Sequence, residues 1–351
     1  MAELITDVEQ VTPAWLSEVL RRAGVLVRGH VRAVEVTLSR ALHVSHVCRL
    51  AVTYTDDAPL DAPAQLFLKL SAPALQAHYS RKEIEFYEKV APLAPELPLL
   101  RCFDAVFDEA TGRAHLLLED VTETHGQPPA PMPPHDGECE AVVDCLAELH
   151  ARWWHDPRLG QEVGQLTTAA EFAELRQLIE TKLAGFLDFL GDRLSAERRA
   201  RYEQVLAGSM YPWRRMLTRE GLTLAHGDAH WWNFLYPRKE GRVLIFDWHQ
   251  WHVDAPLKDL AFLIALNWYP ERRARLEERL LRRYHAQLLA RGVERFSWAD
   301  CWLGYRQQII RELFIPMWQW SSGMGPSVWW SGLEKVWLAF DDLNCAELLD
   351  D

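Results

Sequence analysis

The sequence predicts an α+β fold of two parts, a small strand-rich N-terminal lobe and a larger helical C-terminal lobe. Alternating, β-branched segments come almost entirely before residue 120, and long helical periodicities dominate after residue 136. Between them, the stretch 125–134 holds five prolines in ten residues. Because proline has no N–H donor and fixes φ, this stretch is typical of a linker. We therefore predict lobes over 1–120 and 136–351, joined through a hinge and linker over 121–135.

The N-terminal lobe is expected to begin with a helix and then to form a sheet. Thr12 can cap the helix, Pro13 fits its first position and Gly24 ends it. A second helix, over 77–90, carries a regular apolar stripe. Strands are predicted by alternation and β-branched content at 31–38, 47–55, 65–71, 100–107 and 113–119.

The C-terminal lobe is expected to be mainly helical, with one interruption. The interruption is 222–247, where two short apolar strands, 222–225 and 242–247, flank a loop rich in polar residues. Helical periodicity predicts helices at 137–154, 169–190, 196–217, 257–268, 271–291, 298–318 and 328–349.

Composition excludes several classes of protein. The 351 residues are 49% apolar and 25% charged, values of an ordinary globular protein, and the net charge of −12 argues against a nucleic-acid partner. The six cysteines form no Cys-x-x-Cys pair, and no apolar run approaches the roughly 18–20 residues of a membrane span. We expect a cytoplasmic protein without a membrane partner, and the sequence leaves its oligomeric state open.

The loop between the two C-terminal strands carries the residues with the clearest chemistry. Asp228 follows a strand and a glycine, so its carboxylate can project from a tight turn, and Asn233 lies five residues further on. Asp247 ends the next strand, and a hairpin between the two strands would bring it back beside the loop. A carboxylate and a carboxamide oxygen suit Mg²⁺, and this leaves Asp228 free to accept a proton from a hydroxyl.

These residues resemble the catalytic segment of the aminoglycoside phosphotransferase and choline kinase superfamily. His226, Gly227, Asp228 and Asn233 fit its motif in type and spacing, and Asp247 fits its metal-binding aspartate. The continuation IFDWHQW…DLAFL is similar to bacterial members of the ecdysteroid-kinase-like branch. The resemblance implies a protein-kinase-like bilobal fold with an antiparallel-sheet N-lobe and a mainly helical C-lobe, and ATP and Mg²⁺ as cofactors.

Two other interpretations of the loop remain open at this point. Asp228 and Asn233 can be ordinary turn residues, since both types favour turns. Alternatively, His226, Asp228 and His230 can form a zinc cluster, because imidazole and carboxylate both bind zinc. The zinc hypothesis leaves Asn233 and Asp247 without a role. In the kinase interpretation His226 braces the loop and is not a ligand.

A kinase also needs a cation for the nucleotide phosphates. Lys69 interrupts the apolar strand 65–71, and the resemblance implies that Glu83, in preference to Glu85, pairs with it from the following helix. The structural alternative for Lys69 is a charge that protects an edge strand from aggregation. At the lobe junction, the backbone of Glu119 and Val121 is expected to bind adenine.

The loop between the first two strands departs from the protein-kinase pattern. Its sequence SRALHVSH, residues 39–46, has no glycine, whereas protein kinases cover the phosphates with a glycine-rich loop. Phosphate contacts would then come from the backbone or hydroxyl of Ser45, or from the hydroxyl of Ser39.

The acceptor is suggested by the 16 tryptophans. His230, Trp232 and Trp251 are candidate substrate contacts, because they lie in or close to the catalytic loop. A pocket for aminoglycosides should be lined with carboxylates, and 302–340 offers few. We therefore predict an ATP-dependent O-phosphotransferase, with Asp228 as the base, acting on a small neutral, partly apolar or aromatic hydroxyl compound. One alternative is a non-catalytic relative that binds a nucleotide. Others are an aminoglycoside kinase and a choline kinase, and choline is included because aromatic faces also bind quaternary ammonium.

Overall fold

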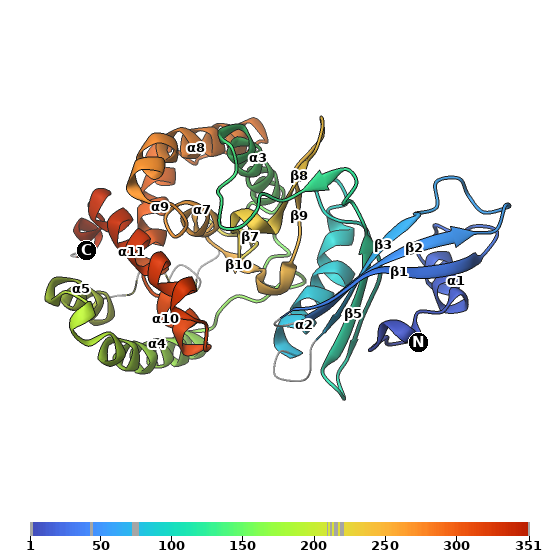
Figure 1. Cartoon of the computed structure of the whole chain (residues 1–351). Coiled ribbons are helices and arrows are strands. Elements are labelled where there is room, and N and C mark those ends of the chain that lie inside the picture. The colour runs from blue at the N-terminus through green and yellow to red at the C-terminus, as the bar shows by residue number, and fades with distance from the viewer. Residues whose placement is uncertain are drawn as a thin grey trace. The chain divides into compact units, whose positions relative to one another are not determined.

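The structure, a computed structural model, describes residues 3–42, 45–71, 77–208, 210, 213, 217 and 221–349. The chain divides into two compact units, one made of Met1–Pro129 and Trp232–Trp251 and the other of Ala130–Trp231 and His252–Asp351 (Figure 1). The segment that carries Asn233 and Asp247 therefore packs with the N-terminal part of the chain. No feature of the sequence had indicated this grouping, and the lobe limits at 120 and 136 stay a prediction.

The first unit contains a five-stranded antiparallel sheet. All five predicted strands are confirmed, and β3 shows the alternating burial that makes such a segment a strand. The sheet lies in the order β1-β2-β3-β5-β4, with β1 (Val31–Ala41), β2 (Ser45–Tyr54), β3 (Gln65–Ser71), β5 (Arg113–Glu119) and β4 (Cys102–Asp108).

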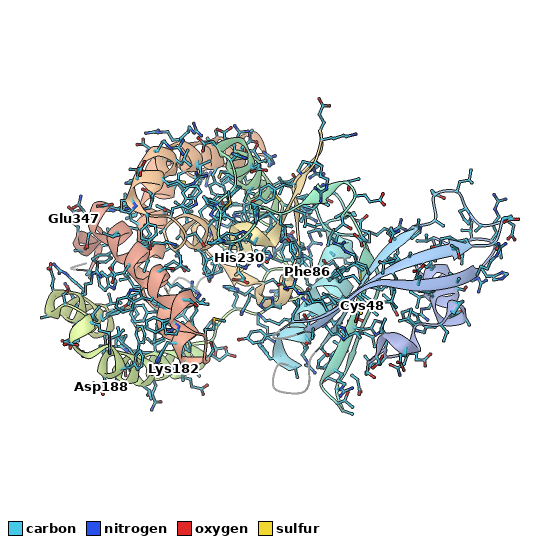
Figure 2. All side chains as sticks on the ribbon, in the orientation of Figure 1. Cys48, Phe86, Lys182, Asp188, His230 and Glu347 are labelled. Atoms are coloured by element: carbon cyan, nitrogen blue, oxygen red, sulfur yellow. The ribbon has the colours of Figure 1, made fainter. Side chains whose placement is uncertain are left out.

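The first helix packs on this sheet as its sequence requires. Helix α1 (Pro13–Arg22) begins at Pro13, and the Thr12 hydroxyl accepts a hydrogen bond from the Trp15 amide at 3.1 Å. Its apolar stripe is buried against residues of β2 and β3, among them Cys48, labelled in Figure 2. The cap and stripe predicted from the sequence are confirmed.

Helix α2 (Ala77–Glu85) does not continue regularly to residue 90 as expected. It widens into a π-turn over Phe86–Val90 and then a 3₁₀ turn over Ala91–Leu93. Trp248 stacks on Phe86 with ring centroids 3.8 Å apart. This stacking places the short 3₁₀ turn Trp248–Gln250 against α2, next to Asp247.

The segment 232–251 joins the first unit through a small sheet of β6 (His125–Gly126), β8 (Phe234–Pro237) and β9 (Leu244–Ile245). The predicted strand 242–247 is thus only two residues long, and it pairs with β8. Strand β7 (Thr223–Ala225) pairs instead with β10 (His252–Asp254) in the second unit. The expected hairpin between 222–225 and 242–247 is therefore wrong, because each strand has a closer partner in its own unit.

The second unit is mainly helical. Two long predicted helices are shorter than expected for a local reason. Pro316 sits at the start of α10 and cannot continue the ladder of α9, and Asn344, with φ of 50°, ends α11 in the left-handed region. The helices are α3 (Asp136–Arg152), α4 (Ala169–Leu190), α5 (Ala196–Ala207), α7 (Leu257–Ile264), α8 (Pro270–Ala290), α9 (Trp298–Glu312), α10 (Ile315–Ser321) and α11 (Pro326–Asp342). The end of the helix predicted over 196–217 lies largely outside the described residues.

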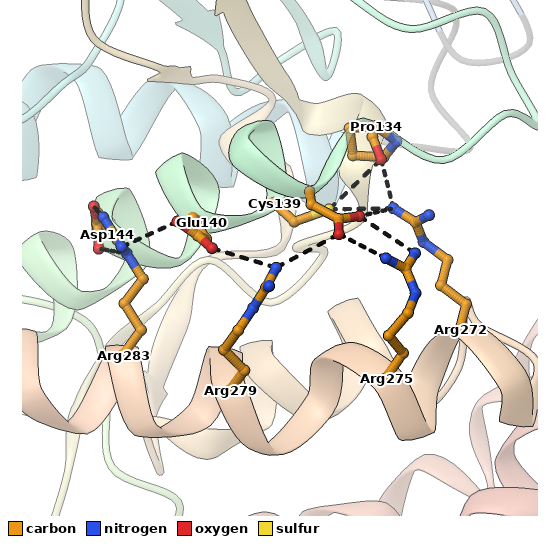
Figure 3. A network of polar contacts seen from close by, with 9 residues as sticks. Pro134, Cys139, Glu140, Asp144, Arg272, Arg275, Arg279 and Arg283 are labelled. Atoms are coloured by element: carbon orange, nitrogen blue, oxygen red, sulfur yellow. Dashed lines mark hydrogen bonds and ion pairs between the residues drawn. The ribbon is translucent and has the colours of Figure 1, made fainter.

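Helices α3 and α8 are joined by a ladder of ion pairs (Figure 3). Arginines on one face of α8 meet acidic residues on α3, and the two-pronged pair of Arg283 with Asp144 has contacts of 2.7 and 2.6 Å. The ladder consists of Arg272, Arg275, Arg279 and Arg283 facing Asp136, Glu140 and Asp144.

Candidate active site

Lys69 lies between two carboxylates of the first unit. Its Nζ donates to Glu83 Oε2 at 2.7 Å and to Asp247 Oδ1 at 2.8 Å. The register of β3 points this side chain to the face of the sheet where α2 packs. The Lys69 side chain is 20% exposed. Burial alone would lower the pKa of Lys69, but Asp247 and Glu83 outweigh it and raise that pKa. The amine is therefore a fixed cation at neutral pH.

Glu83 is the residue of α2 that faces the sheet. Its side chain is 6% exposed and is held by Lys69, whereas Glu85 pairs with the exposed Lys89 at 3.1 Å. Burial raises the pKa of Glu83 and the Lys69 ammonium opposes that rise. The contacts support the choice of Glu83 over Glu85.

Asp247 has an unusual backbone. Its φ of 66° and ψ of 62° lie in the left-handed region, which is uncommon for any residue other than glycine and is often found at functional sites. His249 Nδ1 lies 2.9 Å from the same oxygen, Oδ1, that Lys69 contacts. Although burial opposes charge, Lys69 and His249 lower the pKa of Asp247 well below its usual value. The residue follows β9 by two positions, so it does not end the strand as expected.

The hairpin of β8 and β9 brings Asn233 to the same end as Asp247. Phe234 pairs with Ile245, and the amide of Phe246 donates to the Asn233 carbonyl at 3.2 Å. Asn233 comes directly before Phe234 and Asp247 directly after Phe246, so both residues lie at the same end of the hairpin. Asn233 is 3% exposed. Asn233 and Asp247, the residues predicted to supply oxygen ligands to a metal, thus lie at one end of a hairpin. Ligands of one metal ion must lie close together, so this placement agrees with the prediction.

Asp228 sits in the second unit on a tightly held turn. Gly227 has a φ of 84°, a conformation that favours glycine, and the Asp228 amide donates to His226 Nδ1 at 3.3 Å. The Asp228 side chain remains 24% exposed, and His230 Nε2 lies 3.7 Å from its Oδ2. A partly exposed carboxylate on a rigid turn is suited to accept a proton from a bound hydroxyl.

The turn before Asp228 is braced by Asp259 of α7. This fully buried carboxylate accepts from the amides of His226 at 2.7 Å and Gly227 at 2.9 Å. His150 Nε2 lies 3.1 Å from Asp259. Burial opposes the charge, but the His150 contact and nearby cations lower the pKa of Asp259. Asp259 therefore holds the loop that carries Asp228.

Two further bracing residues were missed by sequence reasoning. His150 of α3 also places Nδ1 2.7 Å from the Tyr284 hydroxyl, and Lys258 Nζ donates to the Gly227 carbonyl at 3.2 Å. Lys258 and Asp259 lie next to each other at the start of α7, so the sequence Lys-Asp-Leu could have indicated that Lys258 braces the loop together with Asp259. His150 gave none, because a lone histidine in an apolar helix is most often a packing residue.

The zinc hypothesis is wrong. Among the residues that the structure describes, no three histidine, cysteine, aspartate or glutamate side chains are grouped so that they could hold a metal ion. His226 is fully buried and its Nδ1 accepts from the Asp228 amide, which agrees with a bracing role.

Some of the residues predicted to contact adenine or phosphate already have hydrogen-bond partners in the protein. The Glu119 amide already donates to the Arg101 carbonyl at 2.9 Å, and the Val121 carbonyl accepts from the His125 amide at 2.7 Å. Ser45 begins β2 and is 5% exposed. Residues 43 and 44, in the glycine-free loop, lie outside the described part of the chain. The Arg49–Asp120 ion pair, at 3.4 Å, fixes the hinge side of the sheet.

Most tryptophans are packing residues. Trp231 is fully buried and stacks on Trp268 with centroids 4.8 Å apart. Trp251 is 2% exposed, and its Nε1 donates to the Lys82 carbonyl at 2.7 Å while Lys82 Nζ donates to the Trp251 carbonyl at 2.8 Å. Trp251 thus holds α2 through Lys82, and its burial is at odds with the predicted contact to the acceptor. Trp232 is half-buried, and its carbonyl accepts from the Gln127 amide group.

None of the helices in the described part of the chain combines the length and apolar character that a membrane-spanning helix needs. All six cysteines are free thiols, and five of them are buried.

Comparisons with solved structures show the fold. A protein from Ralstonia eutropha assigned as an aminoglycoside phosphotransferase matches with a TM-score of 0.55 and 14% identity, over 95% of this chain and 97% of that one. An ethanolamine kinase from Plasmodium vivax matches with a TM-score of 0.54 and 9% identity, over 87% and 81%. A choline/ethanolamine kinase family protein from Mesorhizobium loti matches with a TM-score of 0.50 and 15% identity, over 89% and 87%.

No curated protein matches the sequence significantly. The fold is nevertheless the expected kinase-like α+β fold, with an antiparallel sheet and a mainly helical remainder. The family model described as the phosphotransferase enzyme family matches residues 52–296, which include Lys69, Glu83, Asp228, Asn233 and Asp247. On this match, the chain belongs to the phosphotransferase enzyme family.

Proposed function

We propose that the protein is an ATP-dependent O-phosphotransferase that transfers a phosphoryl group to a hydroxyl of a small molecule. The observation that carries the proposal is the position of Lys69 between Glu83 and Asp247, at 2.7 and 2.8 Å. A strand lysine held by a helix glutamate is what a kinase uses to bind nucleotide phosphates. An edge charge against aggregation would point into solvent and would need neither partner.

Magnesium fits the residues of the hairpin end. Asn233 and Asp247 supply the hard oxygen donors that Mg²⁺ accepts, and they leave further positions for water and phosphate oxygens. When bound, the ion would neutralise charge on the transferring phosphates. The contact of Lys69 with Asp247 keeps that aspartate oriented and ionised before any nucleotide arrives.

Asp228 would receive the acceptor. In the proposal its carboxylate hydrogen-bonds the attacking hydroxyl, orients its lone pair and takes its proton as the bond to phosphorus forms. The Asp259 carboxylate holds the N–H groups of His226 and Gly227, and the Lys258 ammonium holds the Gly227 carbonyl. Catalysis would then come from positioning and electrostatic stabilisation.

We further propose that an aromatic surface in the second unit receives the acceptor. Phe189 of α4 is 47% exposed and lies 5.4 Å from Trp320, centroid to centroid. Lys182 of α4 points to α10, where its Nζ is 5.4 Å from the Trp318 ring centroid and 3.0 Å from Ser321 Oγ (Figure 2). Because this cluster already contains an ammonium group, it disfavours an aminoglycoside or a choline, and a partly aromatic neutral alcohol suits it better.

The test is a screen of hydroxylated compounds for Mg²⁺-dependent ADP release, with GTP run in parallel as the donor. We expect turnover with at least one aromatic or apolar alcohol. The Asp228→Ala variant should lose turnover by about 10³-fold or more with little change in nucleotide affinity, and Asp188→Asn, an exposed residue of α4, should behave as wild type. Equal turnover by the Asp228 variant would exclude it as the base.

A non-catalytic nucleotide-binding relative is the second candidate, and the glycine-free loop over 39–46 favours it. Its signature would be a rise in melting temperature with ATP and Mg²⁺ but no ADP release with any acceptor.

A further inference from the structure

Glu312, the last residue of α9, is a buried carboxyl group that the phosphotransfer scheme does not use. Its side chain is fully buried, and neither carboxyl oxygen has a hydrogen-bond partner within the described residues. Gln308, one turn earlier on the same helix, is equally buried and its amide is equally without a partner there. An ionised carboxylate in such a place is costly, so the group is driven towards its neutral form.

The charges around Glu312 do not cancel that cost. Burial raises the pKa of Glu312 to about 7, with Lys258 and Arg311 lowering it and Asp259 and Asp254 raising it. Three of these four are already engaged elsewhere. Arg311 pairs with Asp254 at 2.6 Å, and Asp254 also contacts His252 at 2.9 Å. Asp259 is held by the loop amides.

Other charged groups on the neighbouring helices have contacts of their own, and Lys335 of α11 lies 4.8 Å from the Tyr269 ring centroid. On α8, Glu277 contacts Arg273 at 3.2 Å and accepts from the Tyr305 hydroxyl at 2.7 Å. On α11, Glu334 contacts Arg198 at 3.0 Å. Lys258 has no carboxylate partner within the described residues: its Nζ donates to a carbonyl oxygen and lies 5.7 Å from the Phe262 ring centroid. A change in the charge of Glu312 is therefore expected to act most strongly on the Lys258 ammonium.

Lys258 links this pair to the loop that carries Asp228. The ammonium is 6% exposed and donates at 3.2 Å to the carbonyl of Gly227, the residue immediately before Asp228. The bond holds the carbonyl of the Gly227–Asp228 peptide, whose N–H donates to His226 Nδ1 at 3.3 Å. A move of the ammonium towards α9 would remove that support from the carbonyl side.

We propose that Glu312 is a positioning residue whose charge sets the catalytic loop: neutral Glu312 leaves the Lys258 ammonium on the Gly227 carbonyl, and ionised Glu312 draws it away. The proton released on ionisation passes to solvent. This inference rests on the proposed function of Asp228, since it concerns how that carboxylate is presented. It predicts an enzyme whose turnover falls as Glu312 ionises, on the alkaline side of neutrality.

The first experiment compares pH profiles of turnover from about pH 6 to about pH 8.5 for the wild type, Glu312→Gln and a matched control, Glu180→Gln, an exposed carboxyl of α4. We expect the wild type and the control to lose turnover several-fold above neutrality. Glu312→Gln should keep its low-pH rate throughout, because its amide cannot ionise. A Glu312→Gln profile that matches the wild type overturns the inference.

The second experiment needs no acceptor, and its first measurement uses the wild-type protein. In the wild-type protein, ¹³C NMR of labelled glutamate carboxyls and ¹⁵N NMR of the Gly227 and Asp228 amides are followed over the same pH range. We expect the amide shifts to follow the Glu312 titration curve, and Lys258→Met to abolish that correlation. Titration of Glu312 without any response at the amides overturns the inference. Correlated shifts in a protein that phosphorylates nothing support the coupling and reject the proposed function alone.

Discussion

The Lys69 ammonium lies 2.7 Å from Glu83 and 2.8 Å from Asp247, so one cation fixes a helix residue and a residue 178 positions away in the chain. Asp247 lies in the segment 232–251, which packs with the N-terminal part of the chain in the first unit. A nucleotide bound there would meet a cation and, already in contact with it, the carboxylate that we propose as a metal ligand.

Replacing Lys69 with Met should remove the cation that Glu83, which is buried, and Asp247, which is half-buried, share. We expect kcat/KM for ATP to fall by about 10²–10³-fold, because electrostatic stabilisation of the phosphates is lost. Steady-state kinetics with varied ATP measures it. Lys89→Met is the control, since its ammonium is exposed, lies in the π-turn Phe86–Val90 after α2 and pairs with Glu85 at 3.1 Å. Equal losses in both variants would contradict a specific role of Lys69.

Asp259 should make stability depend on acid pH. Its pKa is lowered in the folded protein, below an unfolded value of about 3.9, so its stabilisation is complete above that value and is lost as the pH falls through the folded pKa. In Asp259→Asn the acid-induced loss of stability should be smaller. At neutral pH the variant should lose about 3–5 kcal/mol, because the buried amides and His150 lose their anion.

Urea unfolding at neutral and acid pH measures both effects of the Asp259 substitution. The outcome that counts against the bracing role is a neutral-pH stability equal to that of the wild type. Asp192→Asn, at an exposed position after α4, is the matched control and should change neither quantity.

Trp251→Phe tests whether this residue packs or binds substrate. The variant keeps an apolar ring but loses the 2.7 Å bond to the Lys82 carbonyl, which leaves a polar group without its partner. We expect a loss of stability of about 1–3 kcal/mol with KM for the acceptor unchanged. Thermal unfolding and acceptor kinetics measure the two. A raised acceptor KM at unchanged stability would favour Trp251 as a substrate contact.

The ladder between α3 and α8 should contribute unevenly. Arg283 contacts Asp144 at two points, whereas Arg275 is 57% exposed and meets one carboxylate. We expect Arg283→Ala to cost about 1 kcal/mol and Arg275→Ala less, with both effects reduced at high salt. Urea unfolding at low and high ionic strength tests this. Effects independent of salt would point to lost packing of the arginine stems instead.

Much of the site could be predicted because its signals are local. The order His226, Gly227, Asp228 and Asn233 fixes a turn chemistry within eight residues, and the family match over 52–296 agrees with the resemblance drawn from it. The lysine in an otherwise apolar strand stood out for a similar reason, since a charge in an apolar run needs a partner. The strands and the cap of α1 also follow from nearest neighbours.

What the sequence determined by itself was the identity of the elements and the chemical types at the site. Only the tertiary structure decided which elements pair, that β9 joins β8 and β7 joins β10, and that Trp251 holds α2 and Asp259 braces the loop. The physical reason is that pairing, burial and the charge of a buried group depend on residues far apart in the chain. Glu312 is the clearest case, because nothing in its own segment shows that its carboxyl lies buried without a hydrogen-bond partner among the described residues.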